Sequence, residues 1–268
     1  MSDDIYEIYA INYARLDKRR TENFLGGDPH DGPMPLQYYV WVVANAERTI
    51  IVDTGLDQRG AELRGRTITS PVVDGLKALD IDPMKIDDVV ITHMHYDHSG
   101  NNDLFPNARF HLQDTEMAYS TGRCMCHDLL QHPYEMEDVL AMVRRVYDKR
   151  VEFYDGDDQL YPGITLHLVG GHARGLQIVR VKTKRGYVML ASDASHFYEH
   201  IGSNRSFTVV ENVSALLEGY KTVRRLADSP RHIIPGHDPL VGSIYPAAKP
   251  GMENWIMRLD IDPTSSPL

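Results

Sequence analysis

Cysteine is scarce in this sequence, and its scarcity excludes a disulfide framework. The 268 residues contain only Cys124 and Cys126, so we expect a reducing compartment. The C-x-C-H pattern that these cysteines form with His127 could bind a metal. However, no second cysteine pair is present to complete a structural zinc site. The sequence leaves the role of the two thiols open.

Basic charge and long apolar runs are also in short supply. Lysine and arginine total 28 against 38 acidic residues, a formal net charge of −10. That balance argues against a nucleic-acid partner, which needs a basic face. No apolar run approaches the length of a membrane span, and the first residues lack the basic-then-apolar pattern of a signal peptide. We therefore expect a cytoplasmic protein with no membrane partner.

The rest of the composition is that of a folded domain. Hydrophobic residues make up 42% of the chain, enough for a sizeable core, and we expect a single domain over residues 1–268. Residues 114–150 interrupt a pattern of strands and are expected to form a helical cap insertion. Local patterns predict a loop at 17–36, hairpin strands at 37–44 and 49–52, helices at 71–79, 135–147 and 209–227, and strands at 107–113 and between 151 and 193.

The segment Thr92-His93-Met94-His95-Tyr96-Asp97-His98 is the most informative part of the chain. It places three histidines and one aspartate within six positions, directly after the apolar run 88–91. A strand that ends in a tight loop would aim these four side chains into one pocket. Imidazole nitrogens and carboxylate oxygens bind first-row metals, with zinc the default when no thiolate is present. The motif therefore predicts a metal site.

Three more ligand-type side chains follow apolar runs later in the chain. They are His172, Asp193 and His237, and each comes after a small residue or a turn. Glycines at 170, 171 and 236 let the backbone turn sharply at two of these points. Each residue alone is a weak signal, but the same event repeats at several strand ends. The repetition predicts that all of these side chains meet at one centre.

Taken in order, T-H-x-H-x-D-H, G-H, S-D and P-G-H resemble the motifs of the metallo-β-lactamase superfamily. Asp53-Thr54-Gly55 is similar to the early D-T-G turn of that family, and the resemblance covers roughly residues 37 to 240. It implies an α/β fold, a four-layer αββα sandwich with the metals at one edge of the two sheets. It further implies that Asp53 hydrogen-bonds near the ligand loop, that one ion is held by His93, His95 and His172, that the other is held by Asp97, His98 and His237, and that Asp193 bridges both.

The resemblance implies two zinc ions, although other divalent first-row metals suit the same ligands. A water shared by two such ions is a hydroxide near neutral pH, and we expect this hydroxide to be the nucleophile. Asp97 and Asp193 belong to the expected catalytic group. Asp193 can also carry the proton to the leaving group.

Within the superfamily, the chain is most similar to the N-acyl-homoserine lactonase family. A bridging aspartate tells against true β-lactamases, and too few residues follow His237 for the C-terminal helical domain of glyoxalase II thioesterases. We expect a hydrolase that opens a lactone ring. N-acyl-homoserine lactone is the leading substrate, and a small anionic lactone is the next. Hydrolysis of another cyclic amide, ester or thioester stays open, as does a non-hydrolytic metal or redox module. The redox members usually have Glu in the loop motif, which this chain lacks.

Two positions depart from the lactonase pattern. His196 stands three residues after Asp193, where those lactonases usually have tyrosine, and we expect it to support the carbonyl or protonate the leaving group. Tyr198 lies two residues further on and is a second candidate for substrate contact. Arg174 follows His172 where the family usually has proline, and it could clamp a substrate carboxylate or pair with an acidic side chain. The oligomeric state stays open, with a homodimer possible.

Overall fold

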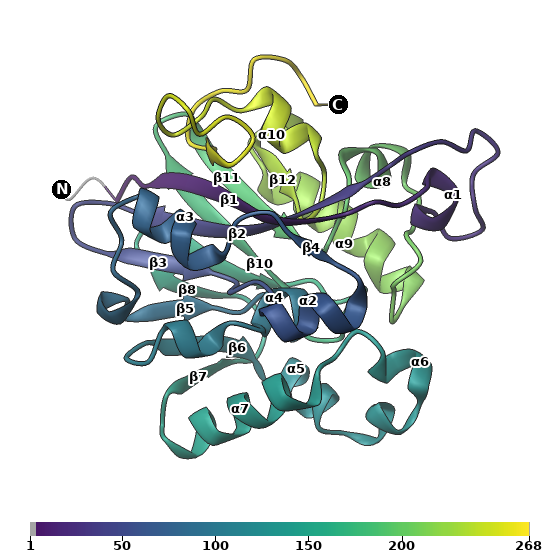
Figure 1. The fold of residues 1–268 in the computed structure, drawn as a ribbon, viewed down its shortest axis with the longest axis horizontal. Helices are drawn as coiled ribbons and strands as arrows, with labels where there is room; N and C mark the ends of the chain where they lie inside the picture. Colours follow the sequence, from purple (N-terminus) through teal and green to yellow (C-terminus); the bar gives the residue numbers. More distant parts are fainter. Residues whose placement is uncertain (1–3, 268) are drawn as a thin grey trace.

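The computed structural model describes residues 4–267 and has four layers, in which helices cover the outer faces of two stacked sheets (Figure 1). Both sheets lie at the centre of the molecule, as the αββα prediction requires. The larger sheet has the order β13 (Ile256–Arg258), β1 (Glu7–Leu16), β2 (Leu36–Ala44), β3 (Thr49–Val52), β5 (Asp88–Val90), β6 (Arg109–Gln113), β7 (Val151–Tyr154), with β4 (Thr67–Ile68) paired to β1. The smaller sheet has the order β12 (Ile233–Pro235), β11 (Gly186–Ser192), β10 (Gln177–Thr183), β9 (Ile164–Leu168), β8 (Asp158–Tyr161).

Strand direction explains why the ligand loops gather at one edge. β3, β5, β6 and β7 are parallel neighbours in the larger sheet, and β11 and β12 are parallel neighbours in the smaller one. The carboxyl ends of parallel strands meet at the same edge of a sheet, where α/β proteins usually bind ligands. The residues that follow β3, β5, β11 and β12 therefore emerge together.

Three apolar clusters separate the four layers. Alternate residues of β2 point to opposite faces, with Tyr39 and Trp41 packed between the sheets and Val40 and Val42 packed under the outer helices. The other outer cluster joins α9 to β10, β11 and β12. The helices are α1 (Arg20–Asn23), α2 (Gln58–Arg64), α3 (Val72–Ala78), η1 (Pro83–Lys85), α4 (Tyr96–Ser99), η2 (Asn102–Leu104), α5 (Asp114–Ser120), η3 (Arg123–Cys126), α6 (Asp128–Gln131), α7 (Met136–Tyr147), α8 (Tyr198–Ser203), α9 (Val213–Leu226), η4 (Pro230–His232) and α10 (Leu240–Ile244).

The predicted cap, residues 114–150, contains the helices α5, η3, α6 and α7. α5 lies next to the ligand loops, and α7 packs on the larger sheet (Figure 1). Val139 and Met142 of α7 are buried in the same cluster as Phe110 of β6 and Tyr119 of α5. The extent of the cap stays a prediction. The helix predicted from residue 209 begins at Val213, because the Asn212 side chain accepts the Ala215 N–H and caps it.

The predicted loop at 17–36 contains the short helix α1 and is fastened to α8. Phe24 is fully buried, and the ring of His200 meets it edge-on with ring centroids 4.7 Å apart. His200 Nε2 donates a hydrogen bond to the Asn23 carbonyl at 3.0 Å. Burial lowers the pKa of His200 to about 4, so the ring is neutral in the folded protein at pH 7.

This buried histidine predicts a stability loss in acid. Because the folded pKa of about 4 lies below the unfolded value of about 6.5, the unfolded chain binds the proton first, and stability falls as pH drops from 6.5 toward 4. The measurement is the free energy of unfolding in urea at pH 7.5 and at pH 5.0. Between these two pH values, His200→Gln should lose about 2 kcal/mol less of this free energy than the wild type loses. Exposed His127→Gln is the control and should lose as much as the wild type; equal losses in all three proteins would contradict the prediction.

Candidate metal centre

The ligand loops leave their strands through two uncommon backbone conformations. Asp53, directly after β3, has φ 62°, and Ser192, the last residue of β11, has φ 45°. Non-glycine residues rarely occupy this left-handed region, and such positions concentrate at functional sites. The turn at Ser192 sends the next side chain, Asp193, inward, where it is 2% exposed.

Asp193 lies at the centre of the site between two groups of histidines, and His237 Nε2 lies 3.2 Å from its Oδ2 atom as well as close to Oδ1. Its Oδ2 atom is 3.1 Å from His172 Nε2 and 3.9 Å from His93 Nε2. Its Oδ1 atom is 3.1 Å from His237 Nε2 and 3.5 Å from His98 Nε2. A carboxylate placed in this way can bridge two ions.

The structure brings all seven predicted ligands together in two sets around this carboxylate. Within each set, the ligand atoms lie within 4.8 Å of one another, and all six residues of the two sets are buried. Asp97 contributes Oδ2, which is 3.6 Å from His237 Nε2 and 3.8 Å from His98 Nε2. The two sets are His93, His95, His172 and Asp97, His98, His237.

The chemistry of the donor atoms fits metal ions. Buried polar atoms normally have a hydrogen-bond partner, yet several atoms that face the centre have none. They are Nε2 of His93, His98 and His172, and Oδ1 of Asp193. Ring nitrogens and carboxylate oxygens are the preferred ligands of zinc and related first-row metals, so the residues fit two such ions.

Hydrogen bonds to the outer ring nitrogens turn the inner ones toward the centre. His98 Nδ1 is 2.7 Å from Asp53 Oδ2, and His172 Nδ1 donates to the Val209 carbonyl at 2.7 Å. His237 Nδ1 donates to the Gln37 carbonyl at 2.9 Å. Such partners fix ring orientation and tautomer in metal sites. The orienting role that the resemblance implied for Asp53 therefore agrees with its position.

Charge at the centre is balanced between histidines and acids. Burial lowers the pKa of His93 and His95 well below the usual value, so both rings are neutral and available as ligands. Burial also acts to lower the pKa of His98, but the carboxylates of Asp193 and Asp53 hold it well above its usual range. Burial would raise the pKa of Asp193, yet the surrounding histidines, His237 foremost, hold it well below its usual range. Asp193 is therefore ionised near neutral pH.

Glu116 is a structural support that the sequence did not reveal. This fully buried side chain of α5 accepts hydrogen bonds from the Met94 N–H at 2.9 Å, the Gly175 N–H at 2.8 Å and the Tyr134 hydroxyl at 3.0 Å. It thus joins the first ligand loop, the His172 loop and the cap. Tyr134 in turn packs edge-on against His95 with ring centroids 4.7 Å apart. A lone glutamate in an amphipathic helix carries no sequence signal of such a role.

The other three predicted site residues lie in different surroundings. His196 faces the centre, with Nε2 3.0 Å from Asp193 Oδ2 and its ring stacked on Phe207. Arg174 is about half exposed and forms an ion pair with Glu211, so the paired alternative describes its position. Tyr198 is buried in the cluster between the sheets. That position does not support the substrate contact predicted for it, because the ring packs away from the ligand set.

The two cysteines lie in the cap. Cys124 is half-buried and Cys126 exposed in η3, and both are free thiols. Within residues 4–267, neither belongs to a group that could hold a metal. No helix among these residues is both long and apolar enough to cross a membrane.

A family model described as the metallo-β-lactamase superfamily matches residues 33–237. The chain belongs to the metallo-β-lactamase superfamily. The match includes all seven predicted ligands, and the prediction of family and fold is confirmed.

Several relatives of the chain are named lactonases. An N-acyl homoserine lactonase of Bacillus thuringiensis is 25% identical over 219 residues, covering 76% of this chain and 82% of that protein. The crystal structure of a quorum-quenching N-acyl homoserine lactone lactonase matches with a TM-score of 0.74 and 24% identity over 89% of this chain and 94% of that one. AidC, a dizinc quorum-quenching lactonase in complex with a product, has a TM-score of 0.68 and 18% identity over 87% and 88%. Family, relatives and ligand cluster support a metallo-hydrolase of the lactonase type.

The tight turn before His237 predicts a selective loss of metal. A Cβ atom at Gly236 would lie 2.2 Å from Asp193 Oδ1 and 2.9 Å from the Ser192 carbonyl, so Gly236→Ala must displace the central carboxylate. We expect this variant to hold fewer than two ions per chain by elemental analysis while its circular dichroism spectrum stays native. Gly219→Ala is the matched control, since its Cβ meets Val169 at an ordinary 3.7 Å. Full metal content in Gly236→Ala would contradict the bridging role of Asp193.

Proposed function

We propose that this protein is a zinc-dependent lactonase that opens a lactone ring by hydrolysis. The observation that carries the proposal is the position of Asp193, whose carboxylate lies between two sets of three ligand-type residues. The lactonase names of the relatives support the reaction class. His93, His95 and His172 would hold one ion, Asp97, His98 and His237 the other, and Asp193 would contact both. When bound, the two ions supply an activated water as nucleophile and polarise the lactone carbonyl.

Residues of the chain itself supply the remaining catalytic roles. The buried walls of the site exclude bulk water and strengthen every electrostatic interaction inside. Asp193 is ionised, so it can accept the proton of the attacking water and deliver it to the leaving alkoxide. Asp97 helps to hold the second set in place. No serine or cysteine nucleophile is needed, and a covalent intermediate is not expected.

His196 is our candidate for the group that supports the leaving oxygen. Its Nε2 atom lies 3.0 Å from Asp193 Oδ2 and has no hydrogen-bond partner. Stacking on Phe207, with ring centroids 3.6 Å apart, fixes the plane of the imidazole. The ring can thus exchange a proton with Asp193 or donate a hydrogen bond to the substrate.

N-acyl-homoserine lactone is the substrate that the relatives favour, and a small anionic lactone is the second candidate. Hydrolysis of another ester, a thioester or a cyclic amide would use the same residues. A cytoplasmic location and a homodimer stay predictions, to be checked by fractionation and by light scattering.

A hydrolysis panel tests the reaction class. We expect acyl-homoserine lactones or carboxylated lactones to be hydrolysed with a higher kcat/KM than aryl esters, glutathione thioesters and cyclic amides, measured by acid release with a pH indicator. Elemental analysis of the same sample should give two zinc ions per chain. Iron with visible colour and no hydrolysis would instead indicate a redox module, and a preferred thioester or cyclic amide would replace the lactone.

Substitution of His196 separates a catalytic residue from a ligand. His196→Ala should keep both ions and lower kcat by about tenfold to a thousandfold, the range for a lost general acid or hydrogen-bond donor. Loss of metal together with activity would make His196 a ligand. Full activity with full metal would make it a bystander. His196→Tyr is the sharper comparison, because activity in that variant would show that a hydroxyl donor is sufficient.

A further inference from the structure

Two cations beside the metal centre have no acidic partner. Among residues 4–267, no salt bridge reaches Lys18 or Arg66, although both side chains are half-buried. Two other half-buried arginines, Arg20 and Arg205, are paired with Asp28. Withdrawing a cation from water without a counter-charge is unfavourable. An unmatched pair therefore indicates a place for a negative charge that comes from outside the chain.

The fold places these two cations at the same end of one ribbon. Arg66 directly precedes β4, whose Thr67 pairs with Arg15 of β1, and Lys18 follows two residues after β1 ends. Their charges act on each other, since Arg66 contributes to a lowered pKa of Lys18 after the larger effect of burial. Glu22 is the acid whose charge opposes this effect, but its Oε2 already accepts the Arg19 N–H at 2.8 Å.

Arg66 is tied to the ligand loop by one side of its guanidinium only. Its Nε donates to the Tyr96 hydroxyl at 2.9 Å, and its Nη1 donates to the Arg64 carbonyl. Tyr96 stands in the chain between the ligands His95 and Asp97. Among the described residues, the Nη2 atom of Arg66 has no hydrogen-bond partner, so two N–H groups stay available beside the centre.

The neighbouring arginine, Arg64, uses both of its terminal nitrogens within the protein. Arg64 donates from both terminal nitrogens to backbone carbonyls of His132 and Tyr134, at 2.7 Å and 2.9 Å, and lies over the Tyr96 ring at 4.1 Å. It holds the cap against the ligand loop and has no terminal nitrogen left for a ligand. Arg174 is also occupied, by Glu211.

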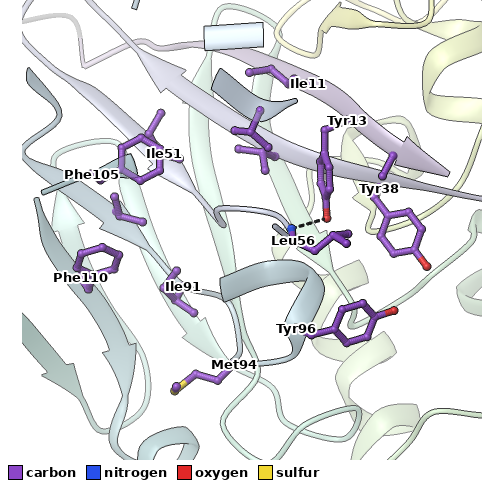
Figure 2. Packing of buried hydrophobic residues seen from close by; sticks show 14 of the residues in the cluster. Ile11, Tyr13, Tyr38, Ile51, Leu56, Ile91, Met94, Tyr96, Phe105 and Phe110 are labelled. Carbon is purple, nitrogen blue, oxygen red and sulfur yellow. Dashed lines mark hydrogen bonds between the residues drawn. The ribbon is translucent and has the colours of Figure 1, made fainter. Parts of the chain in front are cut away.

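The tyrosines on this side connect Arg66 to both halves of the centre. Tyr38 and Tyr96 lie next to each other with their hydroxyl groups on the same side (Figure 2). The ring of Tyr38 packs edge-on against the ligand His237, with ring centroids 4.8 Å apart. Tyr38, Tyr96 and Asp97 all act on the charge of Arg66. The cation thus lies within electrostatic range of a ligand carboxylate and against the wall of the site.

We propose that Arg66 and Lys18 form an anion subsite beside the metal centre, which holds a carboxylate on the lactone substrate. This inference rests on the proposed lactonase function and selects between its two substrate candidates. A guanidinium with a free edge pairs well with a carboxylate, and the lysine ammonium adds a second charge. A lactone with a carboxylate near the ring satisfies both cations. N-acyl-homoserine lactone, which has no charge, leaves them unmatched.

Kinetics with matched lactones test the subsite. The probes are 5-oxotetrahydrofuran-2-carboxylate and the corresponding 2-carboxamide, which share the ring and differ in charge. We expect the wild type to favour the carboxylate in kcat/KM by about tenfold to a hundredfold, as for one or two charge-assisted pairs. Arg66→Gln and Lys18→Gln should each bring this ratio down toward one. Exposed Arg59→Gln of α2 removes the same charge and should keep the wild-type ratio.

A binding measurement keeps the inference independent of turnover. Glutarate carries two carboxylates and butyrate carries one. Calorimetric titration of the metal-loaded protein with each therefore measures what the second carboxylate adds to binding. Glutarate should bind at least about tenfold more tightly to the wild type and to Arg59→Gln, and this advantage should be lost in Arg66→Gln. Melting temperatures of the variants show whether a loss of binding reflects unfolding. Lys18→Gln repeats the test at a residue whose side chain forms no hydrogen bond within residues 4–267.

The two proposals fail in different ways. If both lactones are hydrolysed with equal kcat/KM by the wild type, the anion subsite is wrong and the lactonase proposal stands. If no lactone is hydrolysed but glutarate binds more tightly than butyrate through Arg66, the subsite stands and its substrate is another anionic ester, thioester or cyclic amide. If Arg59→Gln changes the ratios as much as Arg66→Gln, the preference is a general effect of net charge and the subsite is overturned.

Discussion

The carboxylate of Asp193 lies where the ends of the two sheets meet, and the arrangement of the ligands depends on its charge. Several imidazole nitrogens lie 3.0–3.9 Å from its oxygens. A buried carboxylate is costly unless positive charge surrounds it. Protonated histidines supply part of that charge in the protein alone, and two divalent ions would supply more while releasing the histidines to act as neutral ligands. Metal binding and the stability of this edge are therefore linked.

The ligand set could be predicted from the sequence because strand ends concentrate the signal. His93, His95, Asp97 and His98 are neighbours in the chain, so one loop displays them together. His172, Asp193 and His237 are distant in sequence, but each follows an apolar run and a turn, and parallel strands bring such ends to one edge. The four-layer architecture followed from the family resemblance.

The sequence did not reveal residues whose roles depend on contacts with distant parts of the chain. Glu116 lies in α5, far in sequence from the Gly175 N–H that it accepts, and no local pattern marks it. Tyr198 was placed at the site by its distance from Asp193 in the chain, but α8 begins at this residue and turns its ring into the core. Arg66 carried no motif, and its hydrogen bond to the Tyr96 hydroxyl is seen only in three dimensions.

Glu116 has a consequence for how new activities could arise on this scaffold. Its single carboxylate holds the cap, the first ligand loop and the His172 loop in one rigid network. A change in the cap that moves α5 by even a fraction of an ångström is passed directly to Met94, between two metal ligands. Cap substitutions would thus alter the reactivity of the ions as well as the shape of the pocket.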